Sequence, residues 1–168
     1  MSKEIIIGNM ISFVAAVLLG LSCWSRNSRR VFIYQLGENL IYSLSAIVFG
    51  SYSAAVSTLL SAVRSLLIVK GCYTKKYMCF FAVSTAVLGV ITNTKGVIGL
   101  LPVIATVQFA YGSYRFTDIK GIKWMFIINL ILWDIYAFWI KDFSSAIAWA
   151  ITLMITVVSL VKVCLKER

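Results

Sequence analysis

Three ionisable side chains, Glu38, Arg64 and Asp134, lie inside long apolar stretches of this sequence. A charged group is costly in hydrocarbon, so an ionisable residue there is a functional candidate that usually needs a partner. We expect Glu38 and Arg64 to lie roughly 10 Å below the same membrane surface, because a helix rises about 1.5 Å per residue. The two side chains could therefore pair, either as a structural clamp between helices or as a gate or anchor for an anionic solute group.

Asp134 is expected deeper in the bilayer, without a cation at its level. A carboxyl group in that position faces a watery cavity, stays protonated, or marks a proton-coupled step, and a hydrogen-bonded structural acid is the remaining alternative. Of the three ionisable residues, Asp134 is the strongest functional candidate.

Polar and aromatic residues also form stripes at helical spacing. Glu38, Tyr42 and Ser45 stand at i, i+4 and i+7, which places them on one face of a helix. Thr58 and Ser61 form a similar face on the next predicted helix. A shift of about 91 residues, sought as an internal repeat, places both faces on a second polar and aromatic set, namely Asn129, Trp133, Tyr136, Trp149 and Thr152.

These faces predict a solute site in which aromatic rings stack on the solute while amide and hydroxyl groups fix its orientation. Small polar residues also join helices in bilayers without any ligand, and this alternative stays open for Ser and Thr. Trp133 and Tyr136 lie too deep for an interfacial aromatic belt, which favours a cavity wall. The predicted solute-contacting residues are Tyr42, Asn129, Trp133, Asp134, Tyr136, Trp149 and Thr152.

Metal and enzyme chemistry have little support in the sequence. The chain contains no His and only six Asp and Glu residues, which excludes His-based triads and argues against a metal site. The spacing of the four Cys residues fits no zinc pattern, and no nucleophile with an adjacent base is visible. We therefore expect no metal, no cofactor and no enzymatic activity.

Seven apolar segments must carry the candidate residues, and at about 15 to 20 residues their lengths are typical of membrane-spanning helices. With 61% apolar residues and one Pro, the chain has no flexible linker or separate soluble domain. We predict an all-α polytopic membrane protein with a single transmembrane domain, residues 1–168. Its helices are expected at Ile5–Cys23, Val31–Phe49, Ser53–Val69, Met78–Thr92, Val97–Tyr114, Ile122–Ile140 and Ser144–Val161.

The basic residues predict the orientation. Only Lys3, Lys95 and Lys141 fall on one side, whereas most of the 16 Lys and Arg residues lie in the first, third and fifth connections and the tail. Short basic loops stay in the cytoplasm, so we expect the N-terminus outside and the C-terminus inside. This placement also explains the net charge of +10 without a nucleic-acid partner. The basic residues on the inner side are Arg26, Arg29, Arg30, Lys70, Lys75, Lys76, Arg115, Lys120, Lys123, Lys162, Lys166 and Arg168.

The shift between stripes divides the chain into two three-helix units, residues 5–70 and 96–161, joined by a linker helix at 78–92. An odd linker helix keeps the two units parallel. This layout is similar to that of the SWEET sugar facilitators and the PnuC-type vitamin transporters. Pro102, near the outer end of the fifth segment, could act as a hinge of a gating helix, or could be a first-turn proline if the helix begins near Gly99.

Several sequence blocks resemble those of the YgjV family of bacterial inner membrane proteins. The blocks are Gln35-Leu36, Gly50-Ser-Tyr-Ser-Ala-Ala55, Leu60-Ser-Ala-Val-Arg64-Ser-Leu66 and Leu100-Leu-Pro-Val-Ile-Ala-Thr106. The resemblance spans nearly the whole chain and implies a multi-pass protein of the bacterial cytoplasmic membrane. It implies no particular substrate.

Two functions are consistent with these features. The first is a carrier or facilitator of a small polar solute, such as a sugar, nucleoside or vitamin, in which one three-helix unit rocks against the other. The second is a non-transporting assembly or regulatory protein whose stripes pack against helices of a partner. The direction of Asp134 and of the aromatic stripe distinguishes them. A homo-oligomer is an open alternative to a single copy in the bilayer.

Overall fold

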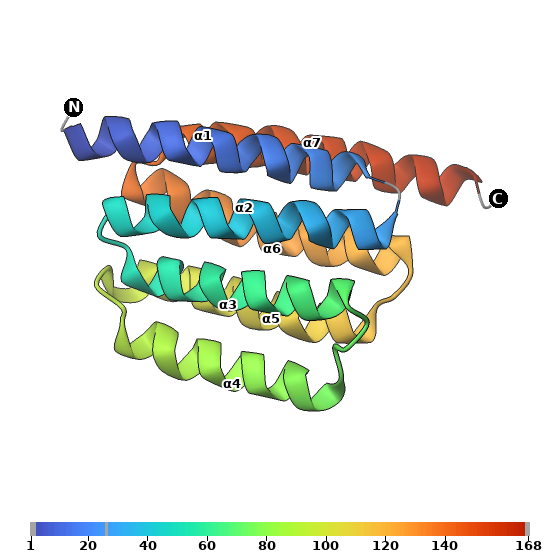
Figure 1. Cartoon of the computed structure of the whole chain (residues 1–168). Helices are drawn as coiled ribbons and strands as arrows, with labels where there is room; N and C mark the ends of the chain where they lie inside the picture. Colours follow the sequence, from blue (N-terminus) through green and yellow to red (C-terminus); the bar gives the residue numbers. More distant parts are fainter. Residues whose placement is uncertain (1–2, 26, 167–168) are drawn as a thin grey trace.

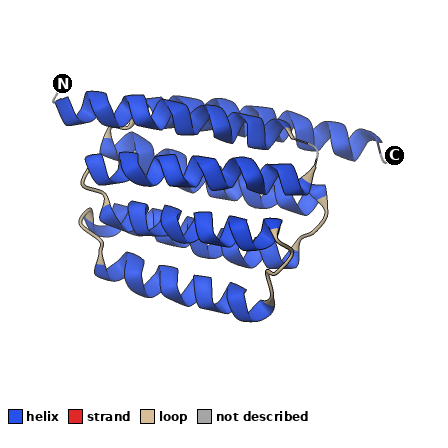
Figure 2. Ribbon diagram, viewed as in Figure 1, coloured by secondary structure: helices blue, strands red, loops and turns tan. Residues whose placement is uncertain are grey.

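The computed structural model describes residues 3–25 and 27–166, and every regular element in that part of the chain is a helix (Figure 2). Arg26 and Arg168, which contribute to the charge pattern, lie outside the described residues, as does the side chain of Lys166. The expected all-α, seven-helix fold is confirmed. The helices are α1 (Lys3–Trp24), α2 (Ser28–Val48), α3 (Tyr52–Val69), α4 (Lys75–Ile91), the 3-10 helix η1 (Gly96–Leu100), α5 (Leu101–Arg115), α6 (Ile119–Ile140) and α7 (Phe143–Lys166).

Six helical stretches in the described part of the chain are long and apolar enough to cross a membrane: α1, α2, α3, η1 with α5, α6 and α7. The remaining helix, α4, has 17 residues and extends about 25 Å at a rise of about 1.5 Å per residue. Large apolar side chains such as Phe13 and Phe138 are mostly exposed, whereas Ser12, Ser53 and Thr85 have no exposed surface. An apolar exterior around a polar interior is the distribution expected of a protein surrounded by lipid.

The helices form two rows (Figure 1). One row contains α1, α2, α3 and α4 side by side, and α7, α6 and α5 lie behind the first three. The flanking helices pack directly across the rows, α1 on α7 and α3 on α5, whereas the middle helices α2 and α6 approach each other less closely. Side chains therefore have to fill the space between α2 and α6.

The two groups α1–α2–α3 and α5–α6–α7 run in the same direction along the bundle, and α4 joins them at one edge (Figure 1). This order is compatible with two parallel units of three helices. The exact division at residues 5–70, 78–92 and 96–161 stays a prediction.

Short connections reverse the direction of the chain between consecutive helices, and capping residues mark the helix ends. The side chain of Asn27 accepts hydrogen bonds from the first backbone N–H groups of α2, and the Asp118 carboxylate accepts one from Gly121 N at 2.9 Å at the start of α6. These are the preferred residue types at helix N-caps. At the end of α6, Lys141 adopts the left-handed conformation with φ 65°, which ends the helix and turns the chain towards α7.

Pro102 lies in the first turn of α5, directly after η1. A proline there removes no intrahelical hydrogen bond, because the first N–H groups of a helix have no partner in it. The first-turn alternative is therefore the one that the structure adopts, and the proline gives no support for a hinge within the helix.

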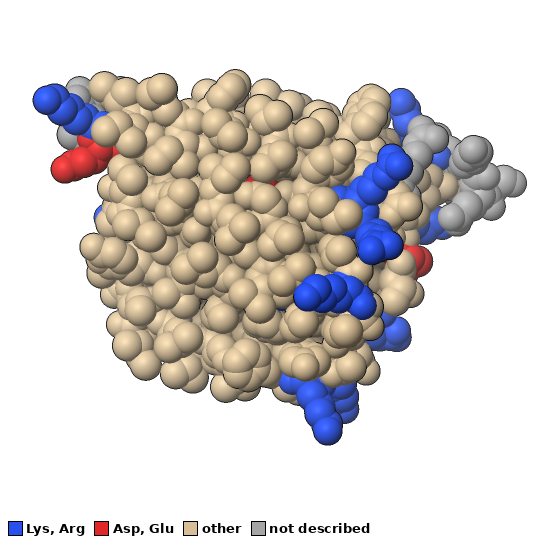
Figure 3. All heavy atoms as spheres, in the orientation of Figure 1, with Lys and Arg blue, Asp and Glu red and all other residues tan. Residues whose placement is uncertain are grey.

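The two ends of the bundle differ in charge. We call the basic end the one that carries the α1–α2, α3–α4 and α5–α6 connections and the last turns of α7, and the other the opposite end. On the face seen in Figure 3, Lys and Arg side chains gather mainly at the basic end and the middle of the bundle is free of them. Lys123, expected in the fifth connection, is instead buried within α6.

Candidate solute cavity

A small cavity lies between the two rows, near the middle of the bundle. Its volume is about 40 Å³, room for about three water molecules at about 10–15 Å³ each. Polar and aromatic side chains from α2, α3, α5, α6 and α7 line it, together with one residue of α1. The lining residues are Leu19, Gln35, Glu38, Asn39, Tyr42, Thr58, Ser61, Arg64, Thr106, Phe109, Phe126, Asn129, Leu130, Trp133 and Trp149.

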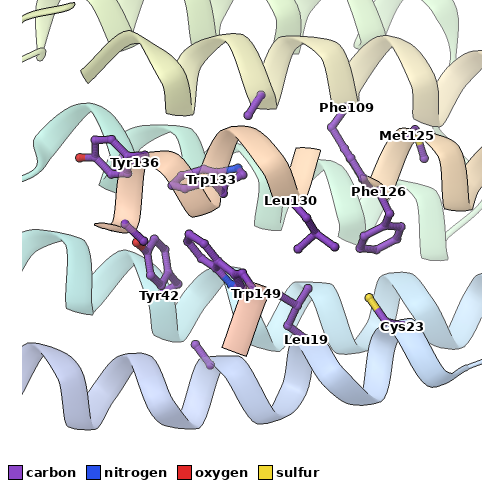
Figure 4. Packing of buried hydrophobic residues seen from close by; sticks show 14 of the residues in the cluster. Leu19, Cys23, Tyr42, Phe109, Met125, Phe126, Leu130, Trp133, Tyr136 and Trp149 are labelled. Atoms are coloured by element: carbon purple, nitrogen blue, oxygen red, sulfur yellow. The ribbon is translucent and has the colours of Figure 1, made fainter. Parts of the chain in front are cut away.

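Three aromatic side chains from three helices meet at the wall of this cavity (Figure 4). The ring of Tyr42 lies 5.6 Å from that of Trp133 and 5.2 Å from that of Trp149, and the two tryptophans are 5.5 Å apart. Edge-to-face and tilted contacts at these distances are favourable for aromatic pairs. The cluster occupies the gap between α2 and α6, because α6 supplies Trp133 and α2 supplies Tyr42. The predicted aromatic stripe therefore faces inward.

The repeat shift relates several of the lining residues to one another. Glu38 and Asn129 line the cavity from α2 and α6, as do Tyr42 and Trp133. Asn129 donates a hydrogen bond from Nδ2 to the Ala105 carbonyl at 2.9 Å, which fixes its amide at the wall. Residues that the 91-residue shift relates therefore line a single cavity between α2 and α6.

Glu38 and Arg64 line the same cavity from neighbouring helices. The Arg64 guanidinium donates from Nη1 to the Thr106 carbonyl at 3.4 Å and lies 4.8 Å from the centre of the Phe109 ring. Although both residues belong to the described part of the chain, their charged atoms form no ion pair within 4.0 Å. The expected direct clamp is therefore not formed. Instead the cavity presents a carboxyl group and a guanidinium at separate positions, and Arg64 Nε is buried without a hydrogen-bond partner.

The remaining predicted site residues lie outside the cavity lining. Asp134 is half-buried and does not line the cavity, because it follows Trp133 by one residue and so points about 100° around the helix. Tyr136 is fully buried beyond the cavity, with its ring 5.9 Å from that of Trp133. Thr152 is also buried, and its carbonyl accepts a hydrogen bond from the Thr156 hydroxyl at 2.7 Å.

A buried carboxyl group at the opposite end was not among the predicted site residues. Asp142 has no exposed surface, and its Oδ2 accepts a hydrogen bond from Ser12 Oγ at 2.8 Å. The hydroxyls of Ser12 and Ser45 are 2.5 Å apart, and Asp142 Oδ1 accepts from Ser145 N at 3.1 Å. The Tyr42 side chain also lies near this carboxyl group. These contacts join α1, α2 and α7, and we call them the Asp142 network.

Burial raises the pKa of Asp142 above its ordinary value, and the hydrogen bonds from Ser12 and Ser145 act in the opposite direction. The sequence places Asp142 in a two-residue connection, where an exposed helix cap is the ordinary expectation. One signal could have identified it: the repeat shift aligns Asp142 with Ser51, which is also fully buried at the start of α3.

Two further polar residues of the cavity, Gln35 and Asn39, were also missed. Both are buried on α2. Asn39 lies beside Glu38 within the stripe, and Gln35 continues the stripe by about one turn towards the basic end. Their spacing from Tyr42, at i−7 and i−3, is the signal that identifies them. The polar lining thus extends further towards the basic end than the stripe of Glu38, Tyr42 and Ser45 predicts.

The family model described as a bacterial inner membrane protein, Imp-YgjV, matches residues 6–167. Neither a curated protein nor a solved structure matches the chain. The match covers nearly the whole sequence and confirms the resemblance indicated by the sequence blocks, and the long apolar helices agree with it. The chain therefore belongs to the YgjV family of bacterial inner membrane proteins and is a multi-pass protein of the bacterial cytoplasmic membrane.

Proposed function

We propose that this protein is a carrier or facilitator of a small polar solute, with its basic end facing the cytoplasm. The observation that carries the proposal is the convergence of the α2 and α6 stripes on one cavity inside an apolar bundle. Polar groups inside a membrane are costly and usually mark a solute or ion pathway. The orientation follows from the basic connections, which stay on the cytoplasmic side.

The lining matches a solute with a flat or ring-shaped part and polar substituents. Tyr42, Trp133 and Trp149 offer ring faces and edges, while Glu38 and Arg64 offer an acceptor and donors at separate positions. In water such groups would bind weakly, but burial strengthens each hydrogen bond and charge interaction. Sugars, nucleosides and vitamin-like compounds have this combination of features.

The volume of about 40 Å³ holds water but no sugar, since pockets for such ligands are several times larger. Solute binding therefore requires α2 and α6 to move apart. These middle helices approach each other less closely than the flanking pairs, so rocking of α1–α2–α3 against α5–α6–α7 would widen the cavity first. This is the motion expected for carriers built from two repeats.

The alternative function, membrane assembly without transport, requires polar groups on the outer surface where a partner helix can reach them. The aromatic stripe faces inward, which favours transport. Asp134, however, lies on α6 away from the cavity and is only half-buried. It is the residue through which an assembly role would act.

The test compares two carboxyl-to-amide changes of equal chemistry. A thermal-shift screen of sugars, nucleosides and vitamins against the purified protein first identifies a ligand, because binding to the folded state raises the melting temperature. Uptake of that ligand into proteoliposomes is then measured for Glu38→Gln, which alters the cavity, and for Asp134→Asn, which does not.

We expect Glu38→Gln to lower uptake at least about tenfold, because a hydrogen bond to a charged group contributes about 1.5–3 kcal/mol, and Asp134→Asn to leave uptake within about twofold. Full uptake by Glu38→Gln would contradict the proposed site. If instead no ligand binds and only Asp134→Asn disrupts co-purification with a partner protein, the assembly role is supported.

A further inference from the structure

A second, larger groove lies at the basic end, between the end of α1, the start of α2 and the last turns of α7. Its volume is about 680 Å³, and α7 extends past the end of α1, so that its final turns form one open wall (Figure 1). The groove is separate from the solute cavity, with which it shares no lining residue. Its lining consists of Cys23, Trp24, Ser25, Asn27, Arg30, Met154, Ile155, Val158, Ser159 and Lys162.

Polar and cationic groups occupy the part of the groove nearest the basic end. Arg30 at the start of α2 and Lys162 near the end of α7 are both exposed, and Ser25 and Ser159 add hydroxyl groups. No carboxyl group lines the groove among the described residues. The cations are therefore available to an anion from outside the protein.

The rest of the groove is apolar and faces outward. Met154 and Val158 on α7 are 61% and 54% exposed, and Ile155 lies between them. Trp24 is 79% exposed beside the cations. A tryptophan ring between a charged and an apolar surface is typical of the depth at which lipid headgroups meet hydrocarbon.

We propose that this groove binds an anionic phospholipid of the cytoplasmic leaflet. The phosphate lies between Arg30 and Lys162, and one acyl chain runs along Met154, Ile155 and Val158. Basic pockets between membrane helices on the cytoplasmic side are suited to anionic headgroups. The charge of the groove selects an anionic over a zwitterionic lipid, and its apolar wall requires the lipid rather than free phosphate.

A groove at the same end supplies the matched control. It lies between α2, α3 and the α5–α6 connection, has a volume of about 460 Å³, and carries Arg29 and Lys70. Both cations are exposed, like Arg30 and Lys162. Removing either pair of charges changes the net charge equally, but only one pair belongs to the proposed lipid site.

The experiment measures retention of phosphatidylglycerol by native mass spectrometry of the purified protein, together with its thermal shift in phosphatidylglycerol, phosphatidylcholine or inorganic phosphate. We expect the intact chain and the Arg29→Gln/Lys70→Gln variant to retain phosphatidylglycerol in preference to phosphatidylcholine. The Arg30→Gln/Lys162→Gln variant should bind it about 30-fold more weakly, given the usual contribution of each basic residue near an anionic membrane surface.

Equal loss in both variants would mean that only overall charge attracts lipid, and the proposal would be wrong. It would also be wrong if inorganic phosphate raised the melting temperature as much as the lipid does. A Met154→Gln/Val158→Gln variant with both cations intact should also lose retention, because the acyl chain then meets polar side chains. None of these outcomes depends on transport through the central cavity.

Discussion

The central cavity is closed differently at its two ends. Towards the opposite end lies the Asp142 network, in which short polar side chains join three helices through hydrogen bonds of 2.5 to 3.1 Å. Towards the basic end lie apolar and aromatic side chains, among them Phe126 and Phe109, whose rings are 5.2 Å apart. Directional hydrogen bonds hold the first closure. Aromatic packing contributes to the second, where Gln35 and Lys123 are also buried.

This difference predicts which end opens more easily. Apolar helices in lipid have little hydrophobic drive to associate, since lipid tails are as apolar as their side chains. Breaking the Asp142 network instead leaves buried donors and acceptors without partners, at about 1–3 kcal/mol for each group. We therefore expect the basic end to part first and the opposite end to hold the two rows together.

Replacing Asp142 should have the largest effect on stability. Asp142→Ala removes the acceptor of Ser12 and of the Ser145 N–H, and we expect it to lower the free energy of unfolding by about 2–3 kcal/mol. Asp118 is the matched control, because it caps α6 in the same manner but is exposed. Asp118→Ala should cost only about 1 kcal/mol.

Thermal unfolding of the purified variants in one detergent measures both changes. Equal destabilisation by Asp142→Ala and Asp118→Ala would show that Asp142 acts only as a helix cap. The hydrogen bonds between helices would then contribute nothing beyond the cap, and the opposite end would hold the two rows no more firmly than the basic end.

Loosening the apolar closure should have a smaller effect on stability but a measurable effect on access. Phe126→Leu removes the edge-to-face contact with Phe109, which is worth about 1 kcal/mol. Ser61 lines the cavity, so a thiol introduced there reports on access from outside. A loss of about 1 kcal/mol raises the population of the open state about fivefold, and we expect the thiol to react with maleimide faster by the same factor.

Ser61→Cys is placed in a chain whose exposed cysteines, Cys72, Cys79 and Cys164, are replaced by Ser. Phe138→Leu serves as the control, since Phe138 lies on the same helix but is 70% exposed on the outside of the bundle. If Phe126→Leu and Phe138→Leu give the same labelling rate as the parent chain, Phe126 does not close the cavity.

Helical spacing is sufficient to predict much of this arrangement. The basic clusters and apolar runs predict seven helices, and i, i+4 and i+7 spacing places Glu38 and Tyr42 on a shared face that does line the cavity. Periodicity gives the angle between residues but not the face that turns inward. Asp134 shows this limit, because its charge suggests an interior position while its neighbour Trp133 is the residue that faces the cavity.

Contacts between distant helices are beyond what the sequence predicts. Asp142 and Ser12 are separated by 130 positions, and a short connection gives no sign that it is buried against α1. The same limit explains why the ion pair expected between Glu38 and Arg64 does not form. Both residues line the same cavity, but the guanidinium turns to the Thr106 carbonyl and the Phe109 ring of α5, a helix that local spacing does not place.

The smallest expected effect is a pH dependence of the hydrogen-bonded closure. Burial raises the pKa of Asp142, so the folded protein holds a proton at a pH at which the unfolded chain has already lost it. The stability associated with this proton is fully present below the ordinary pKa of Asp and is lost as the pH rises through the folded value. For one proton the slope cannot exceed about 1.4 kcal/mol per pH unit.

The matched control for this titration is Asp142→Asn, which keeps an acceptor for the Ser145 N–H group but does not titrate. Subtracting its melting temperature at each pH removes the contribution of the other carboxyl groups. We expect the difference in melting temperature between the parent chain and Asp142→Asn to shift in favour of the parent as the pH falls from 7 to 4. A difference that stays constant over this range would mean that Asp142 is ionised throughout. The closure at the opposite end would then depend on a charged acceptor, and protonation would weaken it instead of stabilising it.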